Sequence, residues 1–170
     1  MSYQETYKDW LTWADEETKE ELLRLTDEKE IEDRFYKDLE FGTAGLRGIM
    51  GAGTNRMNRY TVAKATRGLA DYLKKEHPKT FSQGVVIAYD SRNHSADFAK
   101  EAARVLTSAG IPVRIFEELE PIPVLSLIYC SQLISIIPYS RENRNICLLE
   151  SLFAKKEILH CFITKSMRGF

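Results

Sequence analysis

The spacing of apolar positions predicts helices over the first quarter of the chain. Apolar side chains recur at helical spacing through residues 1–39, and Asp27 stands where a helix N-cap is expected, shortly before Ile31. We therefore predict a helical extension at 1–39. Its two tryptophans are expected to pack against the rest of the fold rather than bind a ligand.

The next part of the chain alternates between helix and strand periods. Apolar spacing predicts helices near 60–75 and 95–109, with Ser95 as a cap, and compact apolar runs predict strands near 85–89 and 112–116. Strand, helix and strand of these lengths form a βαβ unit with parallel strands. The predicted fold is α/β: a three-layer αβα domain with a mixed, mainly parallel sheet, preceded by the helical extension.

The character of the chain changes after about residue 127. Residues 128–170 contain no Asp, no Val and all three cysteines, without CxxC spacing. The apolar stretches 133–137 and 158–163 have no clear period, so strand and helix both stay open. A metal or disulfide role for the cysteines is not expected. We divide the chain into 1–39, 40–127 and 128–170.

Composition narrows the class of protein. A chain of 170 residues with 44% hydrophobic and 29% charged residues is expected to form a globular domain. The net charge of −1 does not favour nucleic-acid binding. There is no long apolar run, and the N-terminus does not resemble a signal peptide, so we expect a cytoplasmic protein without a membrane partner.

Glycines gather in the segment 41–58, which holds five of the nine in the chain. This density is typical of a loop whose backbone approaches a ligand. A Walker loop is not supported, because Thr54 stands where lysine is required. A dinucleotide fingerprint starting at Gly51 would place Arg56 at its third glycine position. The remaining candidate is an anion-binding turn that carries Arg47, Arg56 and Arg59, with solvated or salt-bridged arginines as the alternative.

Four motifs in order resemble the α-D-phosphohexomutase superfamily. They are FGTAGLRG at 41–48, GAGTNRMN at 51–58, AYDSR at 88–92 and PIPVLS at 121–126, where Ile122 replaces a threonine. The resemblance covers roughly residues 5 to 127. The nearest type is the bacterial phosphoglucomutase/phosphomannomutase with a long N-terminal extension, and 40–127 would be part of its domain I.

The resemblance implies a four-domain enzyme that interconverts hexose 1-phosphate and hexose 6-phosphate. A phosphoserine of domain I transfers its phosphoryl group through a bisphosphate intermediate, and Mg²⁺ is held by domain II. Mg²⁺ therefore belongs to the full-length family, and this chain alone is not expected to hold it. The implied ligand is a hexose phosphate.

The motif match also implies roles for individual residues. Arg47 would bind the substrate phosphate, with Thr43 and Gly45 shaping its loop. Asp90 and Arg92 would support the site from the end of a strand. We expect Arg47 and the loop at 45–53 to share one edge of the sheet with Asp90 and Arg92, as an anion-attracting rim.

The chain departs from the family where the catalytic serine is expected. The Ser-His-Asn-Pro loop is absent, residues 136–144 read IIPYSRENR in its place, and the Asp-Gly-Asp metal motif is missing. Ser140 lacks the neighbouring histidine and asparagine, so no residue is assigned as catalytic. We expect a sequence truncated or frameshifted after about residue 127, and a chain that is inactive alone.

Two alternatives remain open at the level of sequence. One is a non-catalytic binder of a phosphorylated ligand or a protein partner, and the other is a small βαβ nucleotide-binding module. The sequence leaves open the choice among glucose, mannose and pentose phosphates, and the oligomeric state.

Overall fold

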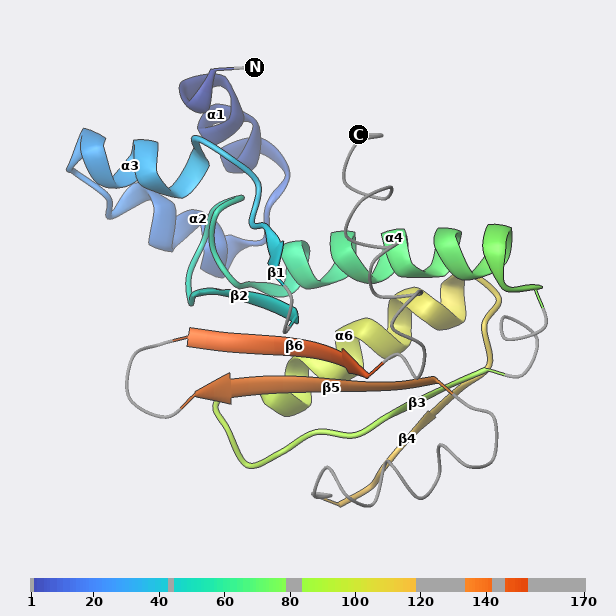
Figure 1. The fold of residues 1–170 in the computed structure, drawn as a ribbon. Helices are drawn as coiled ribbons and strands as arrows, with labels where there is room; N and C mark the ends of the chain where they lie inside the picture. Colours follow the sequence, from blue (N-terminus) through green and yellow to red (C-terminus); the bar gives the residue numbers. More distant parts are fainter. Residues whose placement is uncertain (1, 43–44, 79–83, 119–133, 142–145, 153–170) are drawn as a thin grey trace.

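The computed structural model combines an N-terminal helical unit with a helix-backed sheet (Figure 1). It describes residues 2–42, 45–78, 84–118, 134–141 and 146–152.

The N-terminal extension folds into three short helices, as predicted. They are α1 (Tyr3–Trp13), α2 (Glu16–Leu23) and α3 (Glu28–Phe35). Each starts at a side chain that accepts a hydrogen bond from a backbone N–H of the first turn: Ser2, Asp15 and Asp27. A hydrophobic core unites Trp10, Leu22 and Phe35 with Ala52 from the glycine segment. The two tryptophans pack on aromatic neighbours, with Trp10 against Phe35 and Trp13 against Tyr60.

The two longer helices also confirm the prediction, with one correction. They are α4 (Arg59–Glu76) and α6 (Ser95–Ser108). Ser95 is not the cap of α6: His94 holds that position, with a φ of 62° and no side-chain capping bond. The Ser95 hydroxyl instead accepts from the Asp90 N–H at 3.2 Å. It therefore stabilises the turn before the helix.

The sheet has six strands in the order β1-β2-β6-β5-β3-β4. The pairs β5–β3 and β3–β4 are parallel, whereas β1–β2, β2–β6 and β6–β5 are antiparallel. The sheet is mixed, as expected, but it is mainly parallel only in the half around β3. The strands are β1 (Phe41–Gly42), β2 (Gly45–Ile49), β3 (Val85–Ile87), β4 (Val113–Ile115), β5 (Ile134–Arg141) and β6 (Ile146–Leu152).

The glycine segment is only partly the loop that its composition suggested. Its first part contributes β1 and β2, because short glycine-containing runs can still form ladder hydrogen bonds. The loop proper begins at Gly51, where Gly51 and Gly53 take φ values of 146° and 132°. Such values are readily accessible only to glycine. Among the described residues of this segment, the expected special backbone therefore lies at residues 51–58, just before α4.

The core of the domain lies between the sheet and the helices α4 and α6. These helices pack on each other and share one apolar cluster with β3. Its fully buried members include Leu73, Ile87 and Leu106. The described residues contain the helices of one of the two layers expected for an αβα domain. The α/β class with an N-terminal helical extension is confirmed.

Two strands come from the tail, whose secondary structure the sequence left open. The apolar stretch at 133–137 lies largely in β5, and β6 follows where no element was predicted. The stretch at 158–163 lies outside the described residues. β5 joins the parallel half of the sheet through β3, and β6 joins the antiparallel half through β2.

Adjacent leucines of α2 provide a test of whether the extension folds with the rest. Leu22 is fully buried and Leu23 is 67% exposed. We expect Leu22→Ala to lower the free energy of unfolding by about 2–5 kcal/mol, because it leaves a cavity. The matched Leu23→Ala is expected to change it by no more than about 0.5 kcal/mol. Urea unfolding followed by circular dichroism measures both, and equal effects would contradict this packing.

Candidate functional site at the carboxyl edge of the sheet

Arg47 lies on β2 with its side chain exposed. Side chains alternate between the two faces of a strand. Leu46 is buried in the core, and a Cβ at Gly48 would meet Leu39 and Met57 of the same interior. Arg47 and Ile49 therefore point to the other face, where Ile49 is 52% exposed. No other described residue forms a hydrogen bond or an ion pair with the Arg47 guanidinium.

Asp90 and Arg92 form a turn directly after β3. The Asp90 carboxylate accepts from the Arg92 N–H at 3.1 Å and pairs with the Arg92 guanidinium at 3.4 Å. The Asp90 N–H donates to Ser95 at the start of α6. Asp90 thus organises the connection between the strand and the helix. Both side chains are half-buried, which suits the predicted supporting role but does not test it.

The strand directions and the register place Arg47 level with the Asp90 turn in the same sheet. β2, β5 and β3 run in one direction, with β6 antiparallel between β2 and β5. Arg47 is level with Tyr139 of β5 through Leu148 of β6. Ile87 of β3 is level with Ile136, which precedes Tyr139 on β5 by three residues. Because Asp90 follows Ile87 by three residues, Asp90 comes at about the level of Tyr139 and of Arg47. Three strand spacings, roughly 14 Å in total, separate β2 from β3.

The other predicted site residues are placed less completely. Gly45 is the first residue of β2, two residues before Arg47, and Thr43 lies outside the described residues. Ser140 is in β5 and pairs with Cys147 of β6. The assignment of Thr43 and Gly45 to a phosphate-binding loop stays a prediction.

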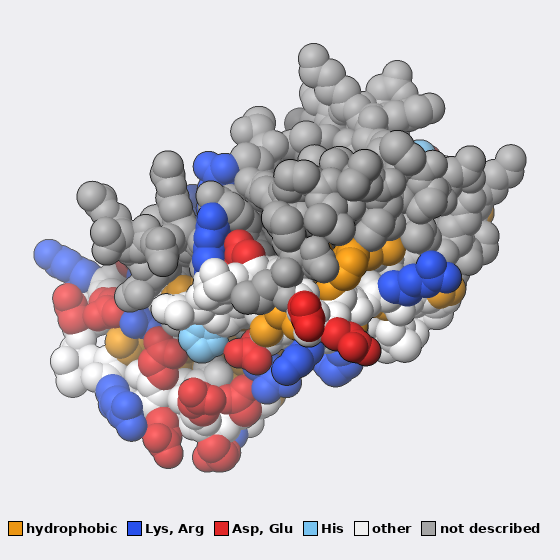
Figure 2. Space-filling view, turned by 90° about the horizontal axis from the view of Figure 1, so that it is seen from below, with side chains coloured by type: hydrophobic (Ala, Val, Ile, Leu, Met, Phe, Trp, Pro, Cys, Tyr) orange, Lys and Arg blue, Asp and Glu red, His pale blue; other side chains and the backbone are white. Residues whose placement is uncertain are grey.

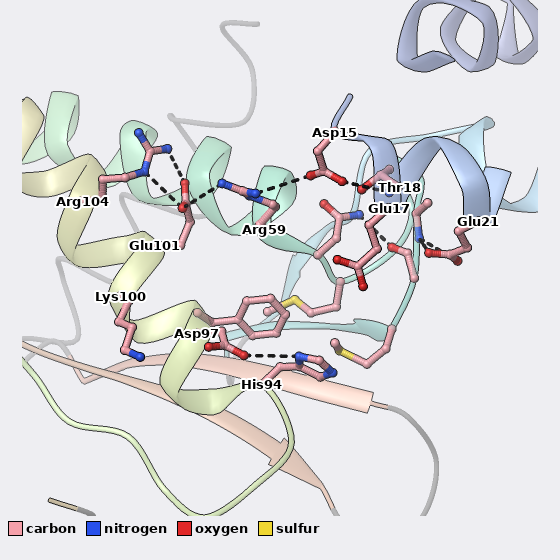
Figure 3. Close-up of a pocket in the computed structure, with 16 residues that line it drawn as sticks. Asp15, Glu17, Thr18, Glu21, Arg59, His94, Asp97, Lys100, Glu101 and Arg104 are labelled. Carbon is pink, nitrogen blue, oxygen red and sulfur yellow. Dashed lines mark hydrogen bonds and ion pairs between the residues drawn. The ribbon is translucent and has the colours of Figure 1, made fainter. Parts of the chain in front are cut away.

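A groove that the sequence did not predict opens beside this edge (Figure 3). It has a volume of about 870 Å³ and lies between α2, the turn after β2 and the first half of α6. Met50, Met57 and Phe98 give it an apolar part, and charged side chains line its walls. Arg47, Asp90 and Arg92 do not line it. The groove and the predicted rim are therefore neighbouring features rather than one pocket.

The charges of the groove are mixed. Arg59 pairs with Asp15 of the extension at 3.4 Å and with Glu101 of α6 at 3.9 Å. Glu101 also pairs with Arg104. In the space-filling view of Figure 2, acidic and basic side chains are interspersed on the face shown. The groove is thus lined by charges of both signs, several of them paired, and it does not bear on the anion-attracting rim expected from Arg47, Asp90 and Arg92.

Tyr60 and Asp15 connect the extension to the start of α4. The Tyr60 hydroxyl donates to the Asp15 carboxylate at 2.6 Å and accepts from the Asp15 N–H at 2.8 Å. The hydrogen bond from Tyr60 lowers the pKa of Asp15. Burial, followed by the bond to Asp15, raises the pKa of Tyr60. Both groups are therefore held in their usual charge states at neutral pH.

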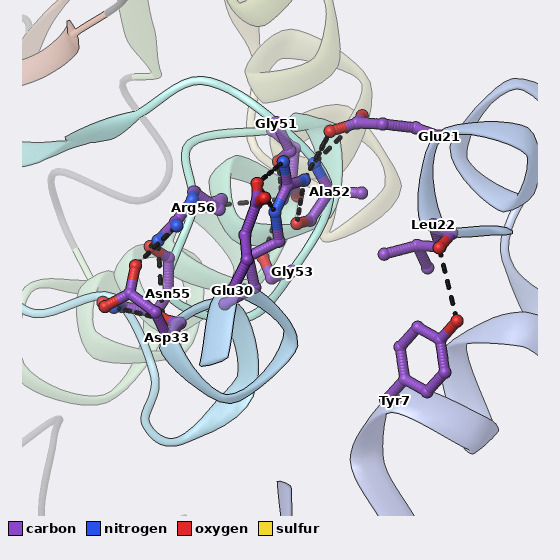
Figure 4. A network of polar contacts seen from close by, with 12 residues as sticks. Tyr7, Glu21, Leu22, Glu30, Asp33, Gly51, Ala52, Gly53, Asn55 and Arg56 are labelled. Carbon is purple, nitrogen blue, oxygen red and sulfur yellow. Dashed lines mark hydrogen bonds and ion pairs between the residues drawn. The ribbon is translucent and has the colours of Figure 1, made fainter. Parts of the chain in front are cut away.

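An ion pair between a buried arginine and an exposed carboxylate fixes the far end of the glycine turn (Figure 4). The side chain of Arg56 is only 7% exposed; its guanidinium pairs with Asp33 of α3 at 2.6 Å and donates to the Asn55 carbonyl. Arg56 is therefore a structural residue in this chain, although its place in a glycine-rich turn made it a candidate for anion binding. No signal in the sequence distinguished Arg56 from Arg47. The two arginines differ in a long-range contact, because only Arg56 pairs with a described carboxylate of the extension.

The described ranges contain no group of three or more His, Cys, Asp or Glu side chains suited to hold a metal ion. Nor do the described helices include one long and apolar enough to cross a membrane.

The fold and this edge define an α/β domain of the kind that binds ligands at the carboxyl ends of its strands. Residues 38–133 match the family model described as phosphoglucomutase/phosphomannomutase, alpha/beta/alpha domain I. The chain therefore belongs to the phosphoglucomutase/phosphomannomutase family, as the four motifs indicated. The match covers domain I, the N-terminal domain of this superfamily.

Relatives support the same family. The chain is 34% identical to phosphopentomutase from Mus musculus over 148 residues, which covers 81% of this chain and 22% of that protein. It is 40% identical to phosphopentomutase from Homo sapiens, with coverage of 67% and 20%. It is 42% identical to phosphoglucomutase from Staphylococcus haemolyticus (strain JCSC1435), with coverage of 56% and 17%. The chain thus spans about a fifth of the length of these curated relatives.

A solved structure supports the fold. A crystal structure of a protein from Thermus thermophilus, assigned as a phosphomannomutase, superposes with a TM-score of 0.61 at 18% identity. The superposition covers 75% of this chain and 29% of that one.

We expect the bond between Tyr60 and Asp15 to stabilise the protein in a pH-dependent way. Tyr60→Phe removes both hydrogen bonds while keeping the ring, and should cost about 1 kcal/mol of unfolding free energy at pH 7. Because the pKa of Asp15 is lowered in the folded state, this contribution is complete above its unfolded value and is lost as pH falls through the folded value. The difference from wild type should therefore shrink below about pH 4.

Thermal unfolding of both proteins between pH 3 and pH 7 measures this. Tyr36→Phe is the control, because Tyr36 is 53% exposed. A Tyr60→Phe deficit that stays constant to pH 3 would show that Asp15 is not the partner that matters.

Proposed function

We propose that this chain provides the phosphate-binding edge of domain I in a sugar-phosphate mutase. The parent reaction would interconvert a sugar 1-phosphate with its terminal phosphate isomer, through an enzyme phosphoserine and a bisphosphate intermediate. Membership of the family supports this reaction class, and the exposed guanidinium of Arg47 is the observation that supports the phosphate-binding site. A cytoplasmic location fits this role and remains a prediction.

Arg47 is the best-supported phosphate ligand among the arginines near the glycine turn. Arg56 is buried against Asp33, and Arg59 is shared between two carboxylates. Arg47 is free of such partners among the described residues and lies at the edge where α/β folds bind ligands. A guanidinium forms two parallel hydrogen bonds with a phosphate, which gives orientation as well as charge neutralisation.

The sugar is proposed as a hexose or a pentose phosphate. The relatives include phosphopentomutases and a phosphoglucomutase, so the family alone does not choose between them. In the full-length family, Mg²⁺ would neutralise charge on the transferring phosphoryl group. We propose that this chain does not hold that ion alone, because its sequence lacks the Asp-Gly-Asp motif.

Substitution of Arg47 should weaken phosphate binding. We expect Arg47→Ala to raise the dissociation constant for glucose 1-phosphate and ribose 1-phosphate at least about tenfold, since it removes a charge-assisted pair of hydrogen bonds. NMR titration of the labelled protein measures the affinity. The matched control is Arg67→Ala, since Arg67 is an exposed arginine of α4 that pairs with Asp71. Equal affinities of the two variants would remove Arg47 from the site.

We expect no mutase turnover from the chain alone. Phosphoryl transfer needs an activated nucleophile and charge neutralisation, and the sequence has no Ser-His-Asn-Pro loop. A coupled assay with glucose 1-phosphate, catalytic glucose 1,6-bisphosphate and Mg²⁺ measures it. Arg47→Ala distinguishes turnover by this chain from contaminating host mutase. Activity that survives purification and disappears in Arg47→Ala would overturn the expected inactivity.

A further inference from the structure

We propose that the helical extension positions the phosphate-binding strand, with Glu21 and Arg34 as the positioning residues. The proposal rests on the function above, since it concerns the strand that carries Arg47. It goes beyond packing, because the two side chains bind the backbone that continues from β2.

The peptide groups of Ala52 are held on both sides by the extension (Figure 4). The Ala52 N–H donates to both carboxylate oxygens of Glu21 at 3.1 Å, and the Ala52 carbonyl accepts from Arg34 at 3.2 Å. Arg34 also pairs with Glu21 and Glu30. The Glu21 carboxylate therefore contacts the turn both directly and through Arg34.

The Arg34 side chain is only 12% exposed, so its charge depends on these partners. Burial acts to lower its pKa, but the hydrogen bonds to Glu21 and Glu30 raise it overall. Removal of one partner of a buried ion pair leaves the other poorly compensated. Loss of Glu21 is therefore expected to disturb Arg34 and its hydrogen bond to the Ala52 carbonyl.

The neighbouring glycine makes this contact a close one. A Cβ at Gly53 would lie 2.7 Å from the Arg34 carbonyl oxygen, so the turn can approach α3 only because residue 53 has no side chain. The Arg34 carbonyl also accepts from the Asn55 N–H at 2.9 Å. The turn is thus seated directly on the C-terminal end of α3.

Short backbone contacts connect this turn to β2. The Met57 N–H donates to the Ile49 carbonyl at 2.8 Å, and the Gly51 N–H donates to the Met57 carbonyl at 3.3 Å. The Asn58 amide donates to the carbonyls of Gly51 and Gly53 and caps α4. Displacement of Ala52 would therefore move Ile49 at the end of β2, and Ile49 follows Arg47 by only two residues.

The test compares Glu21→Ala with Glu20→Ala in the full chain. Glu20 lies next to Glu21 on α2 but pairs only with the exposed Arg24 among the described residues. We expect Glu21→Ala to speed amide exchange at Ala52 and Met57 and to weaken glucose 1-phosphate binding about tenfold. Glu20→Ala should match wild type in both. Glu21→Gln, which keeps an acceptor for the Ala52 N–H, should recover part of the affinity.

The readouts separate positioning from stability and from the proposed function. Affinity is measured well below the melting temperature of each variant, and Glu21→Gln serves if Glu21→Ala does not fold. If folded Glu21 variants bind and exchange like Glu20→Ala, the positioning proposal is wrong. If wild type and Arg47→Ala bind glucose 1-phosphate equally, the proposed function fails. In that case amide exchange at Met57 and the Arg47 backbone resonance still decide whether Glu21 holds the strand.

Discussion

The peptide of Ala52 between a carboxylate and a guanidinium is the contact on which the arrangement of this domain depends. This contact connects α2 and α3 to the glycine turn. The glycine turn is itself hydrogen-bonded to the end of β2 and leads directly into α4. A buried backbone group without a partner is costly, so this turn can be buried beneath the extension only because Glu21 and Arg34 satisfy it. The extension is consequently packed against the domain through a buried backbone contact.

Charge distribution explains how the extension finds its place. Residues 1–40 contain 14 of the 25 acidic residues but only 6 of the 24 basic ones, although the whole chain is nearly neutral. Three acidic residues of the extension, Asp15, Asp33 and Asp38, pair with Arg59, Arg56 and Lys64 of the domain. Surface ion pairs contribute little individually. The aromatic core around Trp10 buries apolar side chains of the extension against Ala52 and Tyr60, while the charges favour one register of docking.

The sequence predicted those parts of the fold that depend on local patterns. Helical spacing located α4 and α6, and the strand-end motif placed Asp90 and Arg92 after β3. The pattern failed where the deciding contacts are distant. Ser95 was predicted to cap α6, but its hydroxyl accepts a hydrogen bond from the Asp90 N–H instead. The glycines of β2 suggested a loop rather than a strand, and β6 had no periodic signal. Glu21 contacts a residue 31 positions away, a pairing that no local pattern can reveal.

The same distant contacts determine which arginine remains available. Arg47, Arg56 and Arg59 look alike in the sequence, each near the glycines and each able to bind an oxyanion. The pleat of β2 turns Arg47 away from the interior that buries Leu46, so the acidic side chains of the extension do not neutralise it. Arg56 and Arg59 lie beyond the strand, where the chain passes under α3 and into α4, and both meet carboxylates there. Which of the three arginines lacks a carboxylate partner among the described residues is therefore a consequence of strand geometry and of the docked extension together.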